Sequence, residues 1–325
     1  MSFLSRLRDY FRAVLWLYDV CHYEKIYIDK CKRIWPNWLG SPKEFFTFES
    51  IEALMENVDS ESRKILLNFI ANLTVDLNNR PLNFLIRYPE CSAENFEKYS
   101  EYQNIDKPEY IQKGLPEPLE EAAVYYHHGM RFLPDSVKNY VKDKIFIDGG
   151  AWIGDSTLVF QTYSPKKVLA FDISLENAKV FHDIMKKNDI SDDKVQLILK
   201  GLGDKLEQKN VKDGEGSITT FDENGDTNVE IITLDSCKEA DGTVGWIKID
   251  LEGYGLPAVK GMVETIKRDR PVLTLAVYHC AEELFGIKKM LESLDLNYKI
   301  MFRSLRFDGY HELTLIAYPA ELDQV

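Results

Sequence analysis

Two carboxylates and an imidazole stand where two apolar segments of the chain end. The stretch VGWIKIDLEG places Asp250 and Glu252 two positions apart, and LAVYH ends at His279. Residues two apart on a strand share a face, so both carboxylates point the same way if the strand persists through residue 252. Paired carboxylates perturb each other's pKa, and histidine is the commonest general base. We expect a catalytic group in which His279 or Asp250 accepts a proton while Glu252 orients the substrate, with roles that could be exchanged.

Two alternatives for these residues stay open. Asp250, Glu252 and His279 could hold a divalent metal that binds a substrate diol, although the sequence does not favour this because no pattern fixes a coordination geometry. They could instead be structural. Lys248 lies on the same face and could neutralise the carboxylates in an ion-pair network, or the carboxylates could cap a helix that begins near Leu256.

A glycine-rich turn follows an earlier apolar segment, and an acidic residue ends the next. In IFIDGGAWIGDS, Asp148 closes a predicted strand, and Gly150 and Gly154 let the backbone turn tightly before a helix from about Ser156. Asp172 ends the following strand in VLAFDIS, where a carboxylate can accept both hydroxyl hydrogens of a ribose. A glycine turn followed about 20 residues later by an acidic strand end favours adenosine binding.

The spacing within this turn distinguishes two adenosine cofactors. In a G-x-G-x-x-G frame Ala151 replaces the glycine that lets the backbone approach a pyrophosphate, which disfavours NAD. S-adenosylmethionine (SAM) has no phosphate and needs acidic groups near its ammonium, a task that suits Asp148. We therefore expect SAM to be the cofactor.

Strands alternate with helices after about residue 115. The predicted strands are KIFIDGG, KKVLAFD, KVQLILKG, NVEIITLD, GWIKIDLEG, PVLTLAVYH, NYKIMFRS and ELTLIAYP, and helices are expected from about Ser156, over Leu175 to Asn188 and through PAVKGMVETIKR. This order implies right-handed βαβ units and a mostly parallel sheet with helices on both faces. Ligands of such sheets bind beyond the carboxyl ends of the strands, where the residues above are expected to meet.

The first part of the chain is predicted to be mainly helical and contains no recognisable chemical motif. Apolar residues recur there at helical spacing, namely Ile51, Leu54, Met55, Ile65, Leu66, Phe69 and Ile70. Prolines and a glycine between residues 108 and 118 interrupt regular structure. We therefore expect a helical N-terminal region of unknown role at residues 1–115 and a second domain at residues 116–325.

The stretch MSFLSRLRDYFRAVLWLYDV predicts an amphipathic helix. Its longest uncharged apolar run, Ala13 to Tyr18, is too short for an export signal or a membrane span. Residues 1–40 carry seven Lys or Arg against four Asp or Glu, which allows weak contact with an anionic membrane surface, although we favour docking on the rest of the protein.

The charge and the cysteine content of the chain indicate which partners it can bind and in which cellular compartment it works. The formal net charge of −13 opposes nucleic acid binding. The five cysteines are widely spaced, with no zinc pattern, and suit a reducing environment. We therefore expect a cytoplasmic protein without a transmembrane segment, whose partner is a small molecule or a glycan.

Six blocks of the sequence together resemble a known family. IFIDGGAWIGDST, VLAFDIS, ITLDS, WIKIDLEG, VKGMVETIKRDRP and LAVYH look like the successive blocks of the FkbM-type methyltransferases, a branch of the class I SAM-dependent fold. The resemblance covers about residues 120–320. It implies a Rossmann-like sheet of seven strands whose final antiparallel strand lies near ELTLIAYP. It also implies O-methylation of a hydroxyl, often on a sugar of a glycan or on a polyketide, so we expect a sugar acceptor, in a glycan or activated by a nucleotide, and a role in polysaccharide biosynthesis.

The resemblance also assigns residues by position. It implies that Asp148, Gly150 and Gly154 line the SAM loop and that Asp172 holds the ribose. Gly203 and Asp204 fall where the fold of the family approaches the adenine. The family usually continues the EG of KIDLEG with Ala-Glu, whereas this chain has Tyr254 and Gly255, so the acceptor pocket is expected to differ.

Further acceptor contacts are expected before the first predicted strand. EEAAVYYHHGMRFLP contains His128 and Arg131, which we take as candidate contacts for a sugar or a phosphate. The two tyrosines of this stretch are expected to pack internally. Tyr254 is a third candidate contact.

Two other functional classes remain. An NAD-dependent sugar oxidoreductase would use the same glycine turn and Asp172. A non-catalytic interaction protein would keep a degenerate cofactor site, which the loss of glutamate at position 255 would suit.

Overall fold

The computed structural model describes residues 38, 45, 47–77, 115, 121–213, 219–221, 225, 227–305 and 312–324. The amphipathic helix predicted before residue 20 lies outside the described residues, as does the proline-rich segment at 108–118 apart from Leu115. No helix in the described ranges is long and apolar enough to cross a membrane.

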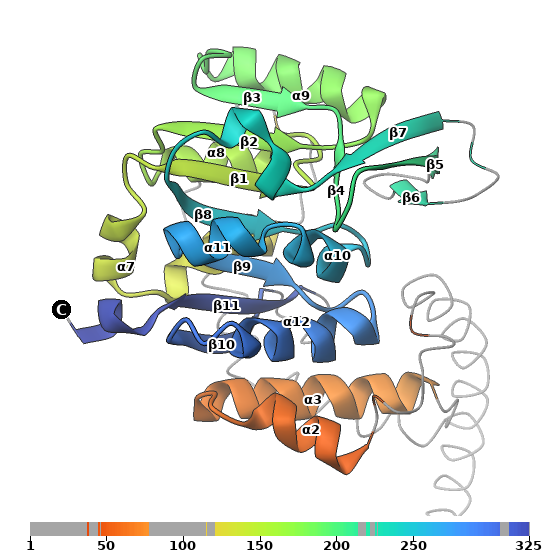
Figure 1. Ribbon diagram of the computed structural model, residues 1–325, viewed down its shortest axis with the longest axis vertical. Coiled ribbons are helices and arrows are strands. Elements are labelled where there is room, and N and C mark those ends of the chain that lie inside the picture. The colour runs from red at the N-terminus through yellow and green to blue at the C-terminus, as the bar shows by residue number, and fades with distance from the viewer. Residues whose placement is uncertain are drawn as a thin grey trace, which may run out of the picture.

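A seven-stranded sheet forms the centre of the molecule (Figure 1). Its strands are β1 (Ile145–Gly149), β2 (Lys167–Phe171), β3 (Val195–Ile198), β8 (Val244–Ile249), β9 (Val272–Ala276), β10 (Tyr298–Ser304) and β11 (Leu313–Pro319). The spatial order is β10-β11-β9-β8-β1-β2-β3. Only β11 runs antiparallel to its neighbours, β9 and β10. The predicted seven-stranded, mostly parallel sheet is confirmed, including its antiparallel strand at ELTLIAYP.

Helices cover both faces of this sheet, so its central strands are buried along their whole length rather than on alternate residues. One face carries α10 (Gly255–Lys260), α11 (Val263–Asp269) and α12 (Ala281–Ser293), packed in one core cluster with Ile147 and Ile247. The opposite face carries α7 (Asp135–Tyr140), α8 (Asp155–Gln161) and α9 (Leu175–Lys187), packed in a second cluster with Phe146 and Trp246. Two short elements, α6 (Glu121–Tyr125) and η4 (His127–Phe132), precede α7.

The single helix predicted through PAVKGMVETIKR is in fact two helices, α10 and α11. At the break, a Cβ on Gly261 would lie 1.8 Å from the carbonyl oxygen of Gly203. The chain therefore needs glycine where two backbone segments touch.

A second, four-stranded sheet lies between β3 and β8 in the sequence. It consists of β4 (Gly201–Leu202), β5 (Glu207–Asp213), β6 (Thr219–Phe221) and β7 (Thr227–Ile232) in the order β4-β7-β5-β6. The short helices η5 (Leu234–Ser236) and η6 (Lys238–Ala240) follow it, and η7 (Ala320–Gln324) follows β11. The prediction that NVEIITLD belongs to the main alternation is wrong, because this segment pairs with β4 and β5 instead.

The helices α2 (Phe48–Met55) and α3 (Ser60–Leu77) pack beside β10 and α12 (Figure 1). Leu54, Leu66, Phe69 and Ile70 are buried in the same core cluster as the sheet, which confirms the predicted helical faces. The domain boundary near residue 115 stays a prediction.

Polar contacts attach α3 to the outer strand of the sheet. The Ser62 hydroxyl donates to the Phe302 carbonyl oxygen at 3.3 Å, and the Phe302 N–H donates to Ser62 Oγ at 2.8 Å. Arg303 donates from Nη2 to Asp59 Oδ2 at 2.7 Å. The backbone of β10 at Phe302 therefore finds its partner in the hydroxyl of Ser62.

Candidate active site

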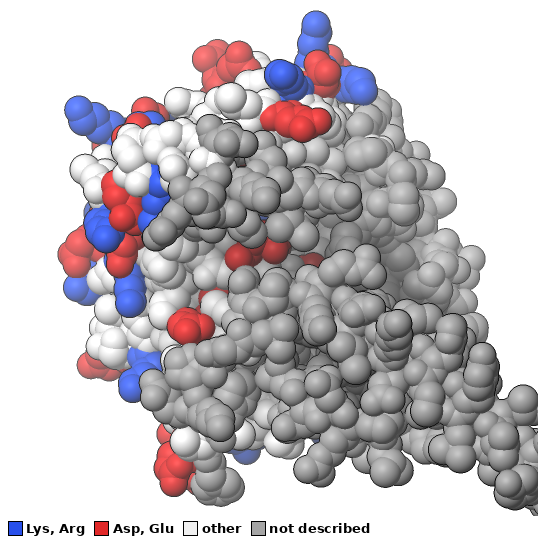
Figure 2. Space-filling model, turned by 90° about the vertical axis from the view of Figure 1, so that its right-hand side faces the viewer, with Lys and Arg blue, Asp and Glu red and all other residues white. Residues whose placement is uncertain are grey.

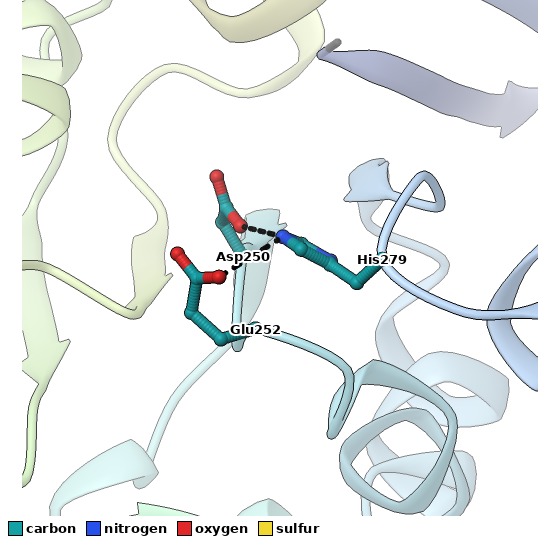
Figure 3. Close-up of side chains that lie close together, drawn as sticks. All are labelled: Asp250, Glu252 and His279. Atoms are coloured by element: carbon teal, nitrogen blue, oxygen red, sulfur yellow. Dashed lines mark ion pairs between the residues drawn. The ribbon is translucent and has the colours of Figure 1, made fainter. Parts of the chain in front are cut away.

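Asp250, Glu252 and His279 come together at the carboxyl edge of the sheet, beyond β8 and β9 (Figure 3). The Nε2 atom of His279 lies 3.2 Å from Asp250 Oδ1 and 3.8 Å from Glu252 Oε2. Figure 2, which views the side of the molecule at the right of Figure 1, shows acidic atoms within a hollow. The predicted convergence of these three side chains is therefore what the structure shows.

A turn, and not strand alternation, brings the two carboxylates together. The strand β8 ends at Ile249, so the expectation that it persists through residue 252 is wrong. Glu252 has a φ of +49° and Gly253 a φ of +100°, and the Tyr254 N–H donates to the Leu251 carbonyl oxygen at 2.9 Å. A left-handed backbone at a glutamate is uncommon and is a feature found at functional sites.

Glu283 is the residue of this site that the sequence reasoning missed. Its Oε2 lies 2.9 Å from His279 Nδ1, and its Oε1 accepts from the Gly255 N–H at 2.8 Å. The side chain has no exposed surface. Because Glu283 holds Nδ1, the other ring nitrogen of His279 points toward Asp250 and Glu252. The available signal was the spacing of four residues between His279 and Glu283, which lies in the first turn of α12.

Burial and mutual charge shift the pKa values of the three groups. Burial lowers the pKa of His279, but the charges and close contacts of Glu283 and Asp250 outweigh it, so the net shift is well above the usual 6.5. Burial raises the pKa of Asp250, yet the close contact and charge of His279 bring it below its usual value. Burial, with the charges of Asp250 and Glu283 against that of His279, raises the pKa of Glu252 to about 7. These shifts favour the protonated form of His279 and make Glu252, whose pKa is raised, a stronger proton acceptor than Asp250, whose pKa is lowered.

The predicted glycine loop packs directly beneath the turn that carries Asp250. Gly150 has a φ of +76°, and a Cβ added to it would lie 1.8 Å from the Asp250 carbonyl oxygen. Lys248 Nζ donates to the Gly150 carbonyl oxygen at 2.7 Å and lies 3.4 Å from Asp148 Oδ1. Lys248 therefore joins β8 to the loop.

Asp148 is fully buried at the end of β1. Its Oδ2 accepts from Ser156 Oγ at 2.7 Å and from Thr157 Oγ1 at 2.6 Å, which ties the strand to the first turn of α8. Gly154, at a φ of +93°, precedes that helix, and a Cβ there would meet Met185 at 2.6 Å. Both residues shape the loop, and their contact with a cofactor stays a prediction.

Asp172 lies at the end of β2, beside the glycine loop. Its Oδ2 accepts from the Trp152 N–H at 2.9 Å, and its Oδ1 accepts from the Ser174 N–H at 2.8 Å. Burial raises the pKa of Asp172, and these hydrogen bonds oppose the shift. The carboxylate therefore also holds the backbone of the loop in place.

Gly203 and Asp204 follow β4. The Gly203 N–H donates to the Ile232 carbonyl oxygen at 2.8 Å, and a Cβ on Gly203 would lie 3.1 Å from the Tyr254 ring. Asp204 is exposed. These two residues border Tyr254, whose hydroxyl accepts from Lys209 Nζ at 2.9 Å and donates to Glu207 at 3.2 Å.

His128 and Arg131 lie in different environments. His128 is buried at a φ of +49°, with Nε2 4.0 Å from Asp155 Oδ2, and burial together with the charge of Lys248 lowers its pKa to about 3. Arg131 is exposed, and its guanidinium lies 4.4 Å from the centre of the Tyr125 ring. Tyr126 stacks on Phe132, in keeping with internal packing.

A family model described as the methyltransferase FkbM domain matches residues 148–300 of the chain. The solved structure of methyltransferase FkbM from Methylobacillus flagellatus KT aligns with a TM-score of 0.54 at 18% identity, over 83% of this chain and 58% of that chain. The chain therefore spans little more than half the length of that protein. An O-methyltransferase from Bacillus cereus, solved with SAH, aligns with a TM-score of 0.43 at 12% identity, over 69% of this chain and 96% of that chain. No curated protein sequence matches the chain.

Proposed function

We propose that the chain is a SAM-dependent O-methyltransferase, because residues 148–300 match the family model described as the methyltransferase FkbM domain. Its acceptor is a hydroxyl of a sugar, in a glycan or in a nucleotide-activated form. The observation that carries the proposal is the meeting of Asp250, Glu252 and His279 next to the glycine loop, at the edge of the sheet where ligands of this fold class bind.

The chemistry of the loop fits SAM better than a dinucleotide. The N–H groups of Gly150 and Ala151 both donate to the Phe171 carbonyl oxygen at 3.0 Å, and that of Trp152 donates to Asp172. Such N–H groups are what a Gly-rich loop offers to a pyrophosphate, and here they are already used. SAM supplies a methyl group on a positively charged sulfonium and carries an ammonium and two ribose hydroxyls, which suit carboxylates such as Asp172.

The residues at the edge have separate tasks toward the acceptor. The proton of the hydroxyl must leave as its oxygen is methylated, and the carboxylates of Asp250 and Glu252 are placed to accept it. His279, held through Nδ1 by Glu283, keeps Nε2 directed at the same point. A positioned proton acceptor typically contributes about 10² to 10⁴ in rate, and correct placement of the acceptor contributes more.

A sugar is supported by the oxygen-rich character of the site. Neighbouring sugar hydroxyls are hydrogen-bond donors, and two carboxylates on one turn offer several acceptor positions for them. Tyr254, with Lys209 and Glu207 beside it, supplies further polar groups from the turn and from the second sheet. Because Tyr254 and Gly255 stand where the family usually has Ala-Glu, we expect the acceptor pocket to differ from those of its relatives.

The test uses the full chain with SAM and a panel of oligosaccharides and nucleotide sugars, analysed by mass spectrometry for methylated products. We expect at least one sugar to gain a methyl group, and Glu252→Gln to reduce the yield. A thermal shift with SAM and with NAD in parallel separates the two cofactors, since a ligand raises the melting temperature of the fold that it binds. Stabilisation by NAD and not by SAM would overturn the proposal in favour of an oxidoreductase.

A further inference from the structure

We infer that Asp250, Glu252 and His279 form a binding site for a divalent metal ion that holds the acceptor hydroxyl. The role toward the acceptor rests on the proposed function, but the binding of the metal does not. The two can therefore fail separately.

The donor atoms have the separation that a shared metal ion requires. One ligand atom from each of the three residues lies within 4.8 Å of the other two, and two of the separations are 3.2 Å and 3.8 Å. Ligands bound at about 2.0–2.2 Å from one metal ion stand roughly 3–4 Å apart. A small movement of the Glu252 side chain toward Asp250 and His279 is thus enough to bring all three ligand atoms around one ion.

Two buried atoms of this group have no hydrogen-bond partner. They are His279 Nε2 and Asp250 Oδ1, which face each other. The His279 side chain is only 5% exposed, so water outside the protein does not satisfy its nitrogen. A buried polar atom without a partner is costly, and an ion between the two would satisfy both.

The opposite nitrogen of His279 is held as it is in metal-binding histidines. Such histidines nearly always donate their other ring N–H to a carboxylate or a carbonyl, which fixes the tautomer and the ring. Glu283 occupies that position, 2.9 Å from Nδ1, and is itself anchored by the Gly255 N–H. This arrangement directs Nε2 at the two carboxylates, and a metal ion bound there would take the place of the proton on Nε2.

The charges around His279 also suit a cation. Three carboxylates, those of Asp250, Glu252 and Glu283, lie within 4 Å of the imidazole ring nitrogens. The nearby cation Lys248 lies 3.4 Å from Asp148 Oδ1 and donates to the carbonyl oxygen of Gly150, so its closest carboxylate lies outside this group. A divalent ion would supply the positive charge that this group of carboxylates needs.

The ligand set indicates which ions fit. One imidazole nitrogen and two carboxylate oxygens suit Mn²⁺, Fe²⁺ or Zn²⁺ better than Ca²⁺, which prefers oxygen ligands alone. The remaining coordination positions would take water or the acceptor hydroxyl. A hydroxyl bound to such an ion loses its proton more readily, and a carboxylate that ligates through one oxygen keeps a second oxygen to accept it.

The test measures Mn²⁺ binding to the full-length protein after treatment with a chelator. The electron paramagnetic resonance signal of free Mn²⁺ falls as the ion binds, and we expect about one bound ion per chain, displaced by Zn²⁺. Asp250→Asn and Glu252→Gln should each weaken the affinity at least about tenfold, and Glu283→Gln should weaken it about 10- to 100-fold. His182→Gln and Asp183→Asn, on the exposed side of α9, are the matched controls and should leave it unchanged.

Each outcome decides for or against the metal site. Binding by the wild type that is lost in the Asp250 and Glu252 variants, with circular dichroism spectra like that of the wild type, supports it. The inference is overturned if the wild type binds none of Mn²⁺, Zn²⁺ and Fe²⁺ at millimolar concentration, or if these variants bind as well as the controls. If methyl transfer persists in the presence of a chelator, the reaction needs no metal ion, and the role of the metal toward the acceptor is overturned. The methyltransferase proposal then still stands. If the protein binds the metal ion but not SAM, the metal site is supported and the methyltransferase proposal is overturned.

Discussion

The Nδ1 atom of His279 lies 2.9 Å from a carboxylate oxygen of Glu283, and the second oxygen of that carboxylate accepts the N–H of Gly255. One buried side chain on α12 thus fixes both the imidazole after β9 and the turn after β8. The distance between His279 and the two acidic residues of the turn therefore depends on a residue that does not itself reach the hollow.

The variant Glu283→Gln should slow methyl transfer without weakening SAM binding. The amide keeps the size of the side chain but replaces one acceptor oxygen by an N–H group, so it cannot serve His279 and Gly255 as before. We expect the turnover number to fall about 10- to 100-fold and the free energy of unfolding to fall by about 1–3 kcal/mol. Turnover measured with isothermal titration of SAM checks this, and an unchanged turnover number would contradict the positioning role.

The variant Gly150→Ala should disrupt the cofactor edge. An alanine would adopt its left-handed backbone at a cost of about 1–2 kcal/mol, and its Cβ would lie 1.8 Å from the Asp250 carbonyl oxygen. The loop and the turn must then separate, so we expect lower stability in urea and loss of SAM binding. Gly286→Ala is the control, because its Cβ would meet only the flexible end of Leu256, at 2.8 Å. Equal behaviour of the two variants would show that the contact at Gly150 is unimportant.

Two substitutions of Asp172 should separate its two tasks. Asp172→Asn keeps a carbonyl oxygen for the Trp152 N–H but removes the negative charge, whereas Asp172→Ala removes both. We expect SAM affinity to fall in both variants and protein stability to fall mainly in the alanine variant, by about 1–3 kcal/mol. Calorimetric titration and thermal unfolding measure the two effects. SAM affinity equal to that of the wild type in both variants would exclude Asp172 from the cofactor site.

The attachment of α3 to β10 should weaken in acid. Burial raises the pKa of Asp59, but its hydrogen bonds to Arg303 and Ser62 outweigh this and bring the pKa to about 2, below an unfolded value of about 3.9. A depressed folded-state pKa gives stability that is present above the unfolded pKa and is lost as pH falls through the folded pKa. We expect the difference in urea midpoint between the wild type and Asp59→Asn to be constant above about pH 5 and to shrink toward pH 2. A difference that does not change with pH would mean that the ion pair contributes nothing.

The fold and the location of the site could be predicted from the sequence because local patterns determine them. Apolar runs such as KIFIDGG and PVLTLAVYH are buried on both faces, so they stand out, and the carboxyl ends of parallel strands must meet at one edge. That rule alone placed Asp250 and His279 together. The match to the FkbM domain then agreed with the resemblance of the same blocks.

The features that were not predicted depend on contacts between distant parts of the chain. The break at Gly261 exists because the backbone of Gly203 passes there, and no local pattern reports that approach. The strand β8 ends at Ile249 and is followed by a turn with a left-handed backbone at Glu252, a residue type that does not signal such a turn. Glu283 looked like an ordinary acidic residue in the first turn of a helix until its partners were known.

The hydroxyl of Ser62 gives the last strand of the sheet a partner that is not a strand. An outer strand normally offers its open backbone groups to any extended chain that it meets, which is a common start of aggregation. Because Ser62 of α3 bonds both the N–H and the carbonyl oxygen of Phe302, α3 blocks that edge of the sheet against pairing with another strand. Damage to this helix should therefore first cause self-association of the protein, before any loss of chemistry at the candidate active site.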